Sequence, residues 1–135
     1  MLFRSRQLVG RASDERLERL FGSSRGQRMI FGRMTGRFDP DRAGGFTGII
    51  RYDLGLSDGT RRCTDIVVRD GRARARAGGA GTPALTIRVP LADFIRVVTE
   101  GGSFLPLVMN GTMTLEGDLN LAGRLAEMFG ARSSY

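Results

Sequence analysis

Residues 72–77 read Arg-Ala-Arg-Ala-Arg-Ala, and this strict alternation constrains the fold more than any other feature of the chain. In an extended strand successive side chains point to opposite faces, so the arginines share one face and the alanines share the other. Asp70-Gly71, directly before the run, is a strong signal for a two-residue hairpin turn. Alanines suit a sheet face that a helix approaches closely, whereas arginines suit solvent and protect an edge strand from aggregation. The pattern therefore predicts a strand whose arginine face meets solvent and which would tolerate a position at the edge of a sheet.

The residues before this strand predict two further strands, which would form an antiparallel meander with it. A first strand is expected over about residues 46–56 and a second over 61–69, joined by a turn at Ser57-Asp58-Gly59. Two helices are expected before the meander. Ser13 is the expected N-cap of the first, and Ser24 that of the second, which ends before Asp39-Pro40 because the residue before proline avoids the helical region.

The last third of the chain is a series of elements that each present one apolar face. A strand at 84–89, a helix from Leu91 to about residue 100, a short apolar segment at 104–109, a strand through Met113 and a final helix at 119–129 follow one another. Asp118 or Asn120 can cap the final helix. With the meander, these elements predict one α+β domain with a mostly antiparallel sheet.

The composition excludes several chemistries. There is no histidine among the 135 residues, which removes the usual general base and metal ligand near neutral pH. Cys63 is the single cysteine, so an internal disulfide and a multi-cysteine metal site are excluded, and we expect no metal and no cofactor. No apolar run is long enough to cross a bilayer, and the first ten residues lack the apolar core of a secretory signal. A cytoplasmic protein is expected.

The net charge is +7, and every one of the 21 basic residues is arginine. Such a balance indicates nucleic acid, an anionic membrane surface or acidic ligands as partners, or simply a genome that prefers arginine. Aromatic residues make up only 7% of the chain and fall mostly on predicted core faces, so stacking platforms for nucleic acid are missing. A transient contact with an anionic membrane is the better use of the arginine stripe.

Two segments carry a family resemblance. Residues 84–94 read Ala-Leu-Thr-Ile-Arg-Val-Pro-Leu-Ala-Asp-Phe, and residues 109–122 read Met-Asn-Gly-Thr-Met-Thr-Leu-Glu-Gly-Asp-Leu-Asn-Leu-Ala. A threonine-containing strand before an Asp-Phe helix, and a short strand flanked by glycines before a Leu-Ala helix, resemble the sterol carrier protein-2 family. The resemblance implies a mostly antiparallel five-stranded sheet covered by about five helices, with an apolar tunnel between them. It also implies non-catalytic binding and transfer of a lipid or similar hydrophobic molecule.

The residues expected to line this tunnel are large and apolar, and several are methionines, which adapt to irregular ligands. The segment at 104–109 is too apolar for a surface loop and too short for a stable isolated helix, so a movable lid is expected there. The expected ligand-binding residues are Phe31, Met34, Phe94, Val98, Phe104, Leu105, Val108, Met109, Met113, Leu121, Leu125, Met128 and Phe129. An ordinary packed core is the alternative for the same faces. Arg28, Arg33, Arg51, Arg88 and Arg96 are candidates for a ligand headgroup.

An enzyme of a biosynthetic pathway, such as a cyclase or isomerase, remains the alternative function. It would use the same pocket with a buried carboxylate, Asp65 or Glu116, and with the Tyr52 hydroxyl. If Thr64, Ile66 and Val68 face the core, as we expect, Asp65 points outward. If Cys63 and Val67 face inward instead, Asp65 lies in the cavity and becomes a candidate acid or base. The expected domain covers residues 24–130, preceded by an arginine-rich extension at 1–23 and followed by a tail at 131–135. The extension would either form a homodimer or plug the mouth of the cavity.

Overall fold

The computed structural model describes residues 14–100 and 103–130. The predicted cap at Ser13, most of the arginine-rich extension and the tail lie outside these residues. The sheet has five strands in the order β3-β2-β1-β4-β5. The strands are β1 (Gly48–Gly55), β2 (Arg61–Arg69), β3 (Arg72–Ala77), β4 (Leu85–Pro90) and β5 (Thr114–Gly117).

Three of the four strand pairs are antiparallel, and β1 pairs with β4 in parallel. The predicted meander is confirmed as β1-β2-β3, and the Arg-Ala strand β3 lies at the sheet edge, where its arginines protect it. The hairpin turn after β2 places Asp70 at φ 54° and Gly71 at φ 71°, the left-handed conformation that an Asp-Gly turn supplies most easily.

The helices are residues 14–21, α2 (Ser24–Gly36), α3 (Leu91–Glu100), α4 (Leu105–Met109) and α5 (Leu119–Met128). The predicted cap of α2 at Ser24 is wrong by one residue, because the Ser23 side chain accepts the hydrogen bond from the Gly26 amide at 3.1 Å. Asp118 caps α5 as predicted and accepts from the Asn120 and Leu121 amides. None of the described helices is long and apolar enough to span a membrane.

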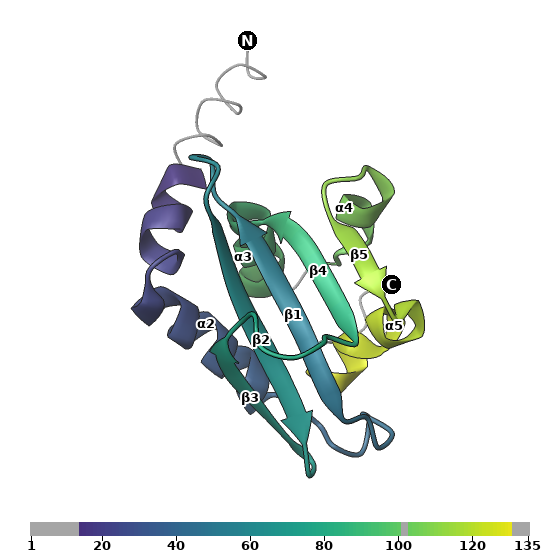
Figure 1. Cartoon of the computed structure of the whole chain (residues 1–135). Helices are drawn as coiled ribbons and strands as arrows, with labels where there is room; N and C mark the ends of the chain where they lie inside the picture. Colours follow the sequence, from purple (N-terminus) through teal and green to yellow (C-terminus); the bar gives the residue numbers. More distant parts are fainter. Residues whose placement is uncertain (1–13, 101–102, 131–135) are drawn as a thin grey trace.

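The helices cover one face of the sheet, and the other face is open (Figure 1). On β1, Ile50, Tyr52 and Leu54 point toward the helices and are at most 3% exposed. Arg51 and Asp53 alternate with them and therefore face the open side. The core between the layers joins β1, β2 and β4 to α2, α3 and α5 through one cluster of buried residues. The residues between β3 and β4 cross in front of the open face (Figure 1).

Candidate functional site

A row of aromatic rings leads from the short helix α4 into the centre of the core. Phe104, directly before α4, stacks on Phe94 of α3 with ring centroids 6.0 Å apart and planes inclined by 20°. Phe94 stacks in turn on Phe31 of α2 at 5.6 Å, and Tyr52 of β1 lies against both rings at 5.3 Å. Phe31 and Phe94 are fully buried, whereas Phe104 is half-buried. The row therefore connects the molecular surface to the deepest part of the interior.

Helix α4 contributes no buried residue, although its sequence is wholly apolar. Leu105 is 60% exposed and Met109 is 79% exposed. Val108 is also exposed, so Leu107, half-buried, is the residue of α4 that packs against the core. Five residues form little more than one turn, and α4 is held chiefly by the backbone hydrogen bond from Met113 to Leu107 and by the ring contact of Phe104. Such an element has a low free energy of local opening.

The predicted ligand-binding residues fall into three groups by exposure. Buried in the core cluster are Phe31, Phe94, Met113, Leu121, Met128 and Phe129, and partly buried against it are Met34, Val98, Phe104 and Leu125. The three α4 residues Leu105, Val108 and Met109 are exposed. All of the predicted residues except those three thus belong to one contiguous apolar interior, whose side chains pack against one another.

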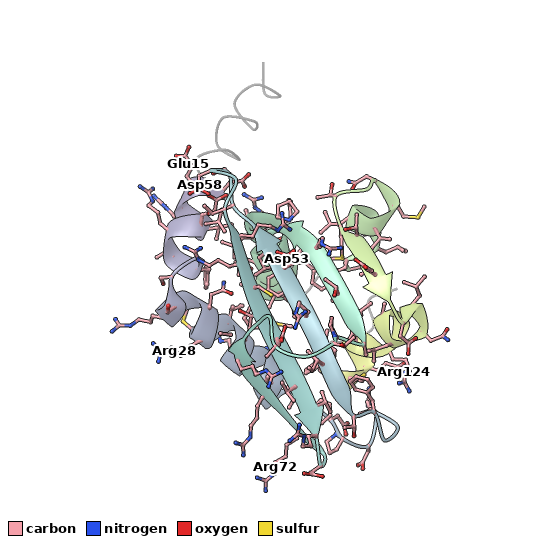
Figure 2. The ribbon with its side chains drawn as sticks, in the orientation of Figure 1. Glu15, Arg28, Asp53, Asp58, Arg72 and Arg124 are labelled. Atoms are coloured by element: carbon pink, nitrogen blue, oxygen red, sulfur yellow. The ribbon has the colours of Figure 1, made fainter. Side chains whose placement is uncertain are left out.

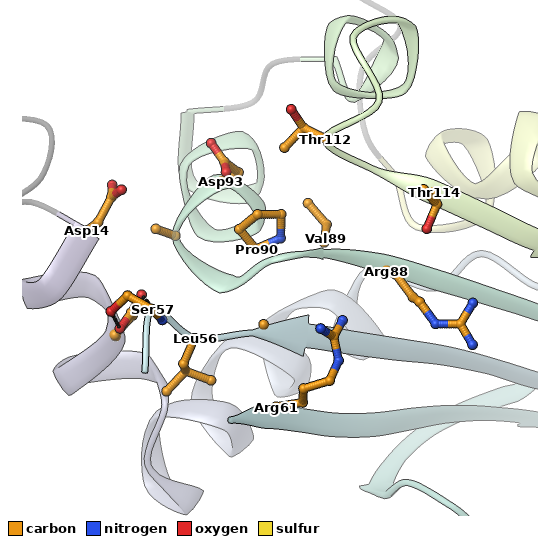
Figure 3. A pocket seen from close by; sticks show the side chains of 13 residues that line it. Asp14, Leu56, Ser57, Arg61, Arg88, Val89, Pro90, Asp93, Thr112 and Thr114 are labelled. Atoms are coloured by element: carbon orange, nitrogen blue, oxygen red, sulfur yellow. Dashed lines mark hydrogen bonds between the residues drawn. The ribbon is translucent and has the colours of Figure 1, made fainter. Parts of the chain in front are cut away.

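A cavity of about 570 Å³ lies elsewhere, beside the C-terminal ends of the parallel strands β1 and β4. Asp14 and Asp93 lie at one side of it and Arg61 and Arg88 at the other, with Pro90 between them (Figure 3). None of the predicted ligand-binding residues lines this cavity. Its walls come from residues 14–18, 55–61, 88–93 and 112–114. These four segments are far apart in the sequence, so no local sequence pattern predicts that their carboxylates and arginines meet.

Ion pairs set the electrostatics of the cavity. Arg96 bonds to Asp14 and lies 3.9 Å from Asp93. Desolvation nevertheless raises the pKa of Asp93 above its ordinary value. On the opposite side Arg61 donates to Asp53 at 2.6 Å, and Arg88 donates to Glu116 at 2.6 Å, which raises the pKa of Arg88. The charged side chains of the wall are thus largely paired, and their partners Arg96, Asp53 and Glu116 do not line the cavity.

Of the candidate headgroup arginines, only Arg88 lines the cavity. Arg96 does not line it but bonds to Asp14, which does. Arg28 and Arg33 lie exposed on α2, and Arg51 is engaged with Asp65. In the described residues no three histidine, cysteine or carboxylate side chains are grouped to hold a metal ion.

The residues considered for catalysis are not brought together. Thr64 and Ile66 face the core, so Asp65 points to the open face, where it is fully buried and accepts two hydrogen bonds from Arg51 at 2.9 and 3.0 Å. These bonds raise the pKa of Arg51. Glu116 is exposed on β5, and Tyr52 lies on the core face, where burial raises the pKa of its phenol. The two carboxylates thus lie outside the apolar interior, on strands separated by β1 and β4.

Solved structures share this architecture at low sequence identity. Sterol carrier protein 2 from Yarrowia lipolytica, in its apo form, is 16% identical with a TM-score of 0.62, over 82% of this chain and 94% of that one. Palmitated sterol carrier protein 2 like 2 from Aedes aegypti is 20% identical with a TM-score of 0.55, over 76% and 92%. A stereoselective inverting sec-alkylsulfatase from Pseudomonas sp. is 21% identical with a TM-score of 0.61, over 82% of this chain but only 17% of the enzyme. No curated protein sequence matches significantly.

The fold and the aromatic-lined interior define a two-layer α+β domain of the sterol-carrier type. The profile of the SCP-2 sterol transfer family matches residues 31–130, and the chain belongs to this family. The resemblance read from the two C-terminal segments is thereby confirmed. Membership places the chain in a class of lipid-binding and lipid-transfer domains.

Proposed function

We propose that this protein binds one lipid or similarly hydrophobic molecule in an apolar tunnel that opens between the sheet and helices α3, α4 and α5. The observation that carries the proposal is the continuous row Phe104–Phe94–Phe31 beneath a helix that buries none of its own residues. The row marks the path that an acyl chain would take. Family membership and the palmitated mosquito relative support an acyl chain as the ligand class.

Entry of the ligand requires α4 and Phe104 to move outward. The rings of Phe104, Phe94 and Phe31 pack against one another, so the acyl chain replaces contacts that Phe104 and its neighbours now make. Met113 and Met128 adapt easily to this exchange because an unbranched thioether side chain has several accessible rotamers. The three exposed α4 residues would turn toward the acyl chain once it enters.

The expected affinity is moderate. Burying a palmitoyl-length chain contributes about 12 kcal/mol, at about 0.8 kcal/mol per methylene. Association costs at least about 4 kcal/mol, which leaves an affinity of about 1 μM before the displacement of Phe104 is counted. A carrier must release its ligand, and an affinity in this range permits release.

A tryptophan in place of Phe104 tests the proposal directly, because the chain contains no tryptophan of its own. In Phe104→Trp the indole should stack on Phe94, and its emission should shift to longer wavelength in a saturable way as palmitate displaces it. Met29→Trp is the matched control, since Met29 is 53% exposed on the outer side of α2 and should report no change.

Extraction of the purified wild-type protein with organic solvent, followed by mass spectrometry, provides an independent readout. A bound lipid in the extract supports the proposal. An unchanged Phe104→Trp spectrum at high palmitate concentration, together with an extract free of lipid, would contradict it.

A further inference from the structure

We propose that the open face of the β2–β3 hairpin docks this protein onto anionic lipid bilayers. The docking surface is the arginine cluster formed by Arg69, Arg72 and Arg74. The choice of a bilayer as partner rests on the proposed function, because a lipid carrier must meet the membrane from which it loads. The cluster itself is independent of the ligand site, which lies on the helix-covered side of the sheet.

The strand register gathers these arginines on one face. Arg69 of β2 stands directly opposite Arg72 of β3, and Val67 stands opposite Arg74. All three arginines are exposed, and their positions alternate with Val68 and Ala73, which point toward the helices. Residues two apart on a strand lie about 7 Å from each other, so the guanidinium groups form a compact cationic row.

Like charges directly opposite one another in a sheet destabilise the fold. Arg69 and Arg72 form such a pair, and no neighbouring carboxylate among the described residues neutralises their charge. Within the described part of the chain, none of the three arginines takes part in an ion pair. Asp65, the acidic residue on the same face of β2, is engaged with Arg51. Asp70 in the turn pairs with none of them, and Asp39 pairs with Arg42. The fold therefore retains an unneutralised cationic surface at a cost to its own stability.

The shape and chemistry of this surface favour a bilayer over nucleic acid. Single-stranded nucleic acid is typically held by aromatic side chains on which its bases stack. The described residues on the open face of β1, β2 and β3 include no aromatic side chain, because Tyr52, the aromatic residue of these strands, points into the core. What the open face offers is a flat arginine row beside the half-buried Val67, which suits a planar array of anionic headgroups.

The chain provides a control with the same loss of charge. Arg16, Arg19 and Arg124 are exposed and, in the described residues, take part in no ion pair. Arg124 lies on α5 on the flank opposite Arg72 (Figure 2). The test therefore compares Arg69→Gln/Arg72→Gln/Arg74→Gln with Arg16→Gln/Arg19→Gln/Arg124→Gln in the full chain. Binding is measured by co-sedimentation with vesicles of phosphatidylcholine, with and without phosphatidylserine.

We expect the wild type to bind only the phosphatidylserine vesicles and to be released by high salt, which screens the charges. The cluster variant should bind about 100-fold more weakly, since each arginine near an anionic surface contributes about a fivefold gain in affinity. The control variant should lose much less. The cluster variant should also melt at a slightly higher temperature than the wild type, because the repulsion between Arg69 and Arg72 is gone, and this excludes misfolding as the cause.

Equal losses in the two triple variants would overturn the proposal, because net charge alone would then explain binding. Absence of any preference for phosphatidylserine would overturn it too, as would tighter binding to single-stranded DNA that the cluster variant loses. Palmitate binding without vesicles separates the two proposals. The cluster variant should bind palmitate like the wild type, and a protein that docks on vesicles but binds no palmitate would refute the carrier function alone.

Discussion

Asp65 and Arg51 form the most buried ion pair among the described residues. The Asp65 side chain is fully buried and that of Arg51 is 17% exposed. Arg51 also donates to the carbonyl groups of Ala80 and Gly81, so the pair fastens the loop between β3 and β4 onto the open face. A Cβ on Gly78 would lie 2.3 Å from the Cys63 sulfur and 3.0 Å from Asp65 Oδ1, so glycine is needed for this close approach. The loop in turn shields Asp65 from water.

Removing the Asp65 charge should therefore be costly. We expect Asp65→Asn to lower the free energy of unfolding by about 3 kcal/mol, because Arg51 keeps a desolvated charge without its partner. Asp53→Asn is the control: it removes the more exposed pairs with Arg61 and Arg88 and should cost about 1 kcal/mol or less. Urea unfolding measures both. A cost for Asp65→Asn no larger than that for Asp53→Asn would show that the pair contributes little.

At the scale of elements, α2 makes its closest approach to the preceding helix at a glycine. A Cβ on Gly26 would lie 2.1 Å from the Leu20 carbonyl oxygen and 2.6 Å from the Phe21 Cα, both of them backbone atoms. Gln27 strengthens the contact, since its side-chain amide donates to the Phe21 carbonyl at 2.6 Å. The helix of residues 14–21 is thus positioned by the first turn of α2.

Two glycine substitutions in α2 should therefore have opposite effects. Gly26→Ala should lower the free energy of unfolding by about 1–3 kcal/mol, because the backbone of residues 20–21 must shift. Gly32→Ala should raise it by about 0.5–1 kcal/mol, since no atom lies within 4 Å of the added Cβ and alanine is the better helix former. Thermal unfolding of both variants measures the difference. Stabilisation by Gly26→Ala would mean that the two helices are not packed this closely.

The secondary-structure elements that local sequence patterns define could be predicted, whereas the contacts between distant segments could not. The β3 alternation and the Asp-Gly turn predict the hairpin because the information is local, and the alternation around Ile66 predicts that Asp65 faces away from the core. The same pattern could not predict that a loop buries Asp65, because that contact depends on tertiary packing. Likewise Ser23 and Ser24 both satisfy the capping pattern, and only the backbone conformation at Ser23 decides between them.

The candidate site was predictable only in part, because local sequence patterns do not determine tertiary contacts. Helical periodicity identified the buried faces of α3 and α5, which carry Phe94 and Leu121. A five-residue helix has too few positions for periodicity to define its inner face, so the exposure of Leu105 and Met109 was not foreseen. The polar cavity joins Asp14 to Asp93 and Arg88, which are far from it in the sequence and which only the complete fold brings near it.

At the scale of the whole molecule, Tyr52 reports on the integrity of the core. It lies on the central strand β1 between Phe31 and Phe94, and burial raises its pKa above its ordinary value of about 10. Folding therefore favours the neutral phenol. This contribution to stability is complete below about pH 10 and is lost as the pH rises through the folded-state pKa.

An alkaline titration followed at 295 nm tests this coupling. The chain has two tyrosines, so Tyr135→Phe leaves Tyr52 as the single phenol. We expect this variant to show no ionisation near pH 10 and a single step at higher pH that coincides with the loss of circular dichroism. Tyr52→Phe, as control, should lack that step. Ionisation of Tyr52 near pH 10 in a protein that stays folded would contradict the packing around it.

The parallel pairing of β1 with β4 also affects how the chain folds while it is being synthesised. β1 finds its first partner in β2 soon after both are synthesised, but its second edge stays open until β4 has emerged, since Ile50 pairs with Leu85 and Leu54 with Val89. Until then the nascent chain contains a three-stranded meander whose open edge is β1, a strand with three buried apolar side chains, and such an edge is a template for aggregation. The growing chain should be most dependent on chaperones in the interval after β3 has completed the meander and before β4 has emerged.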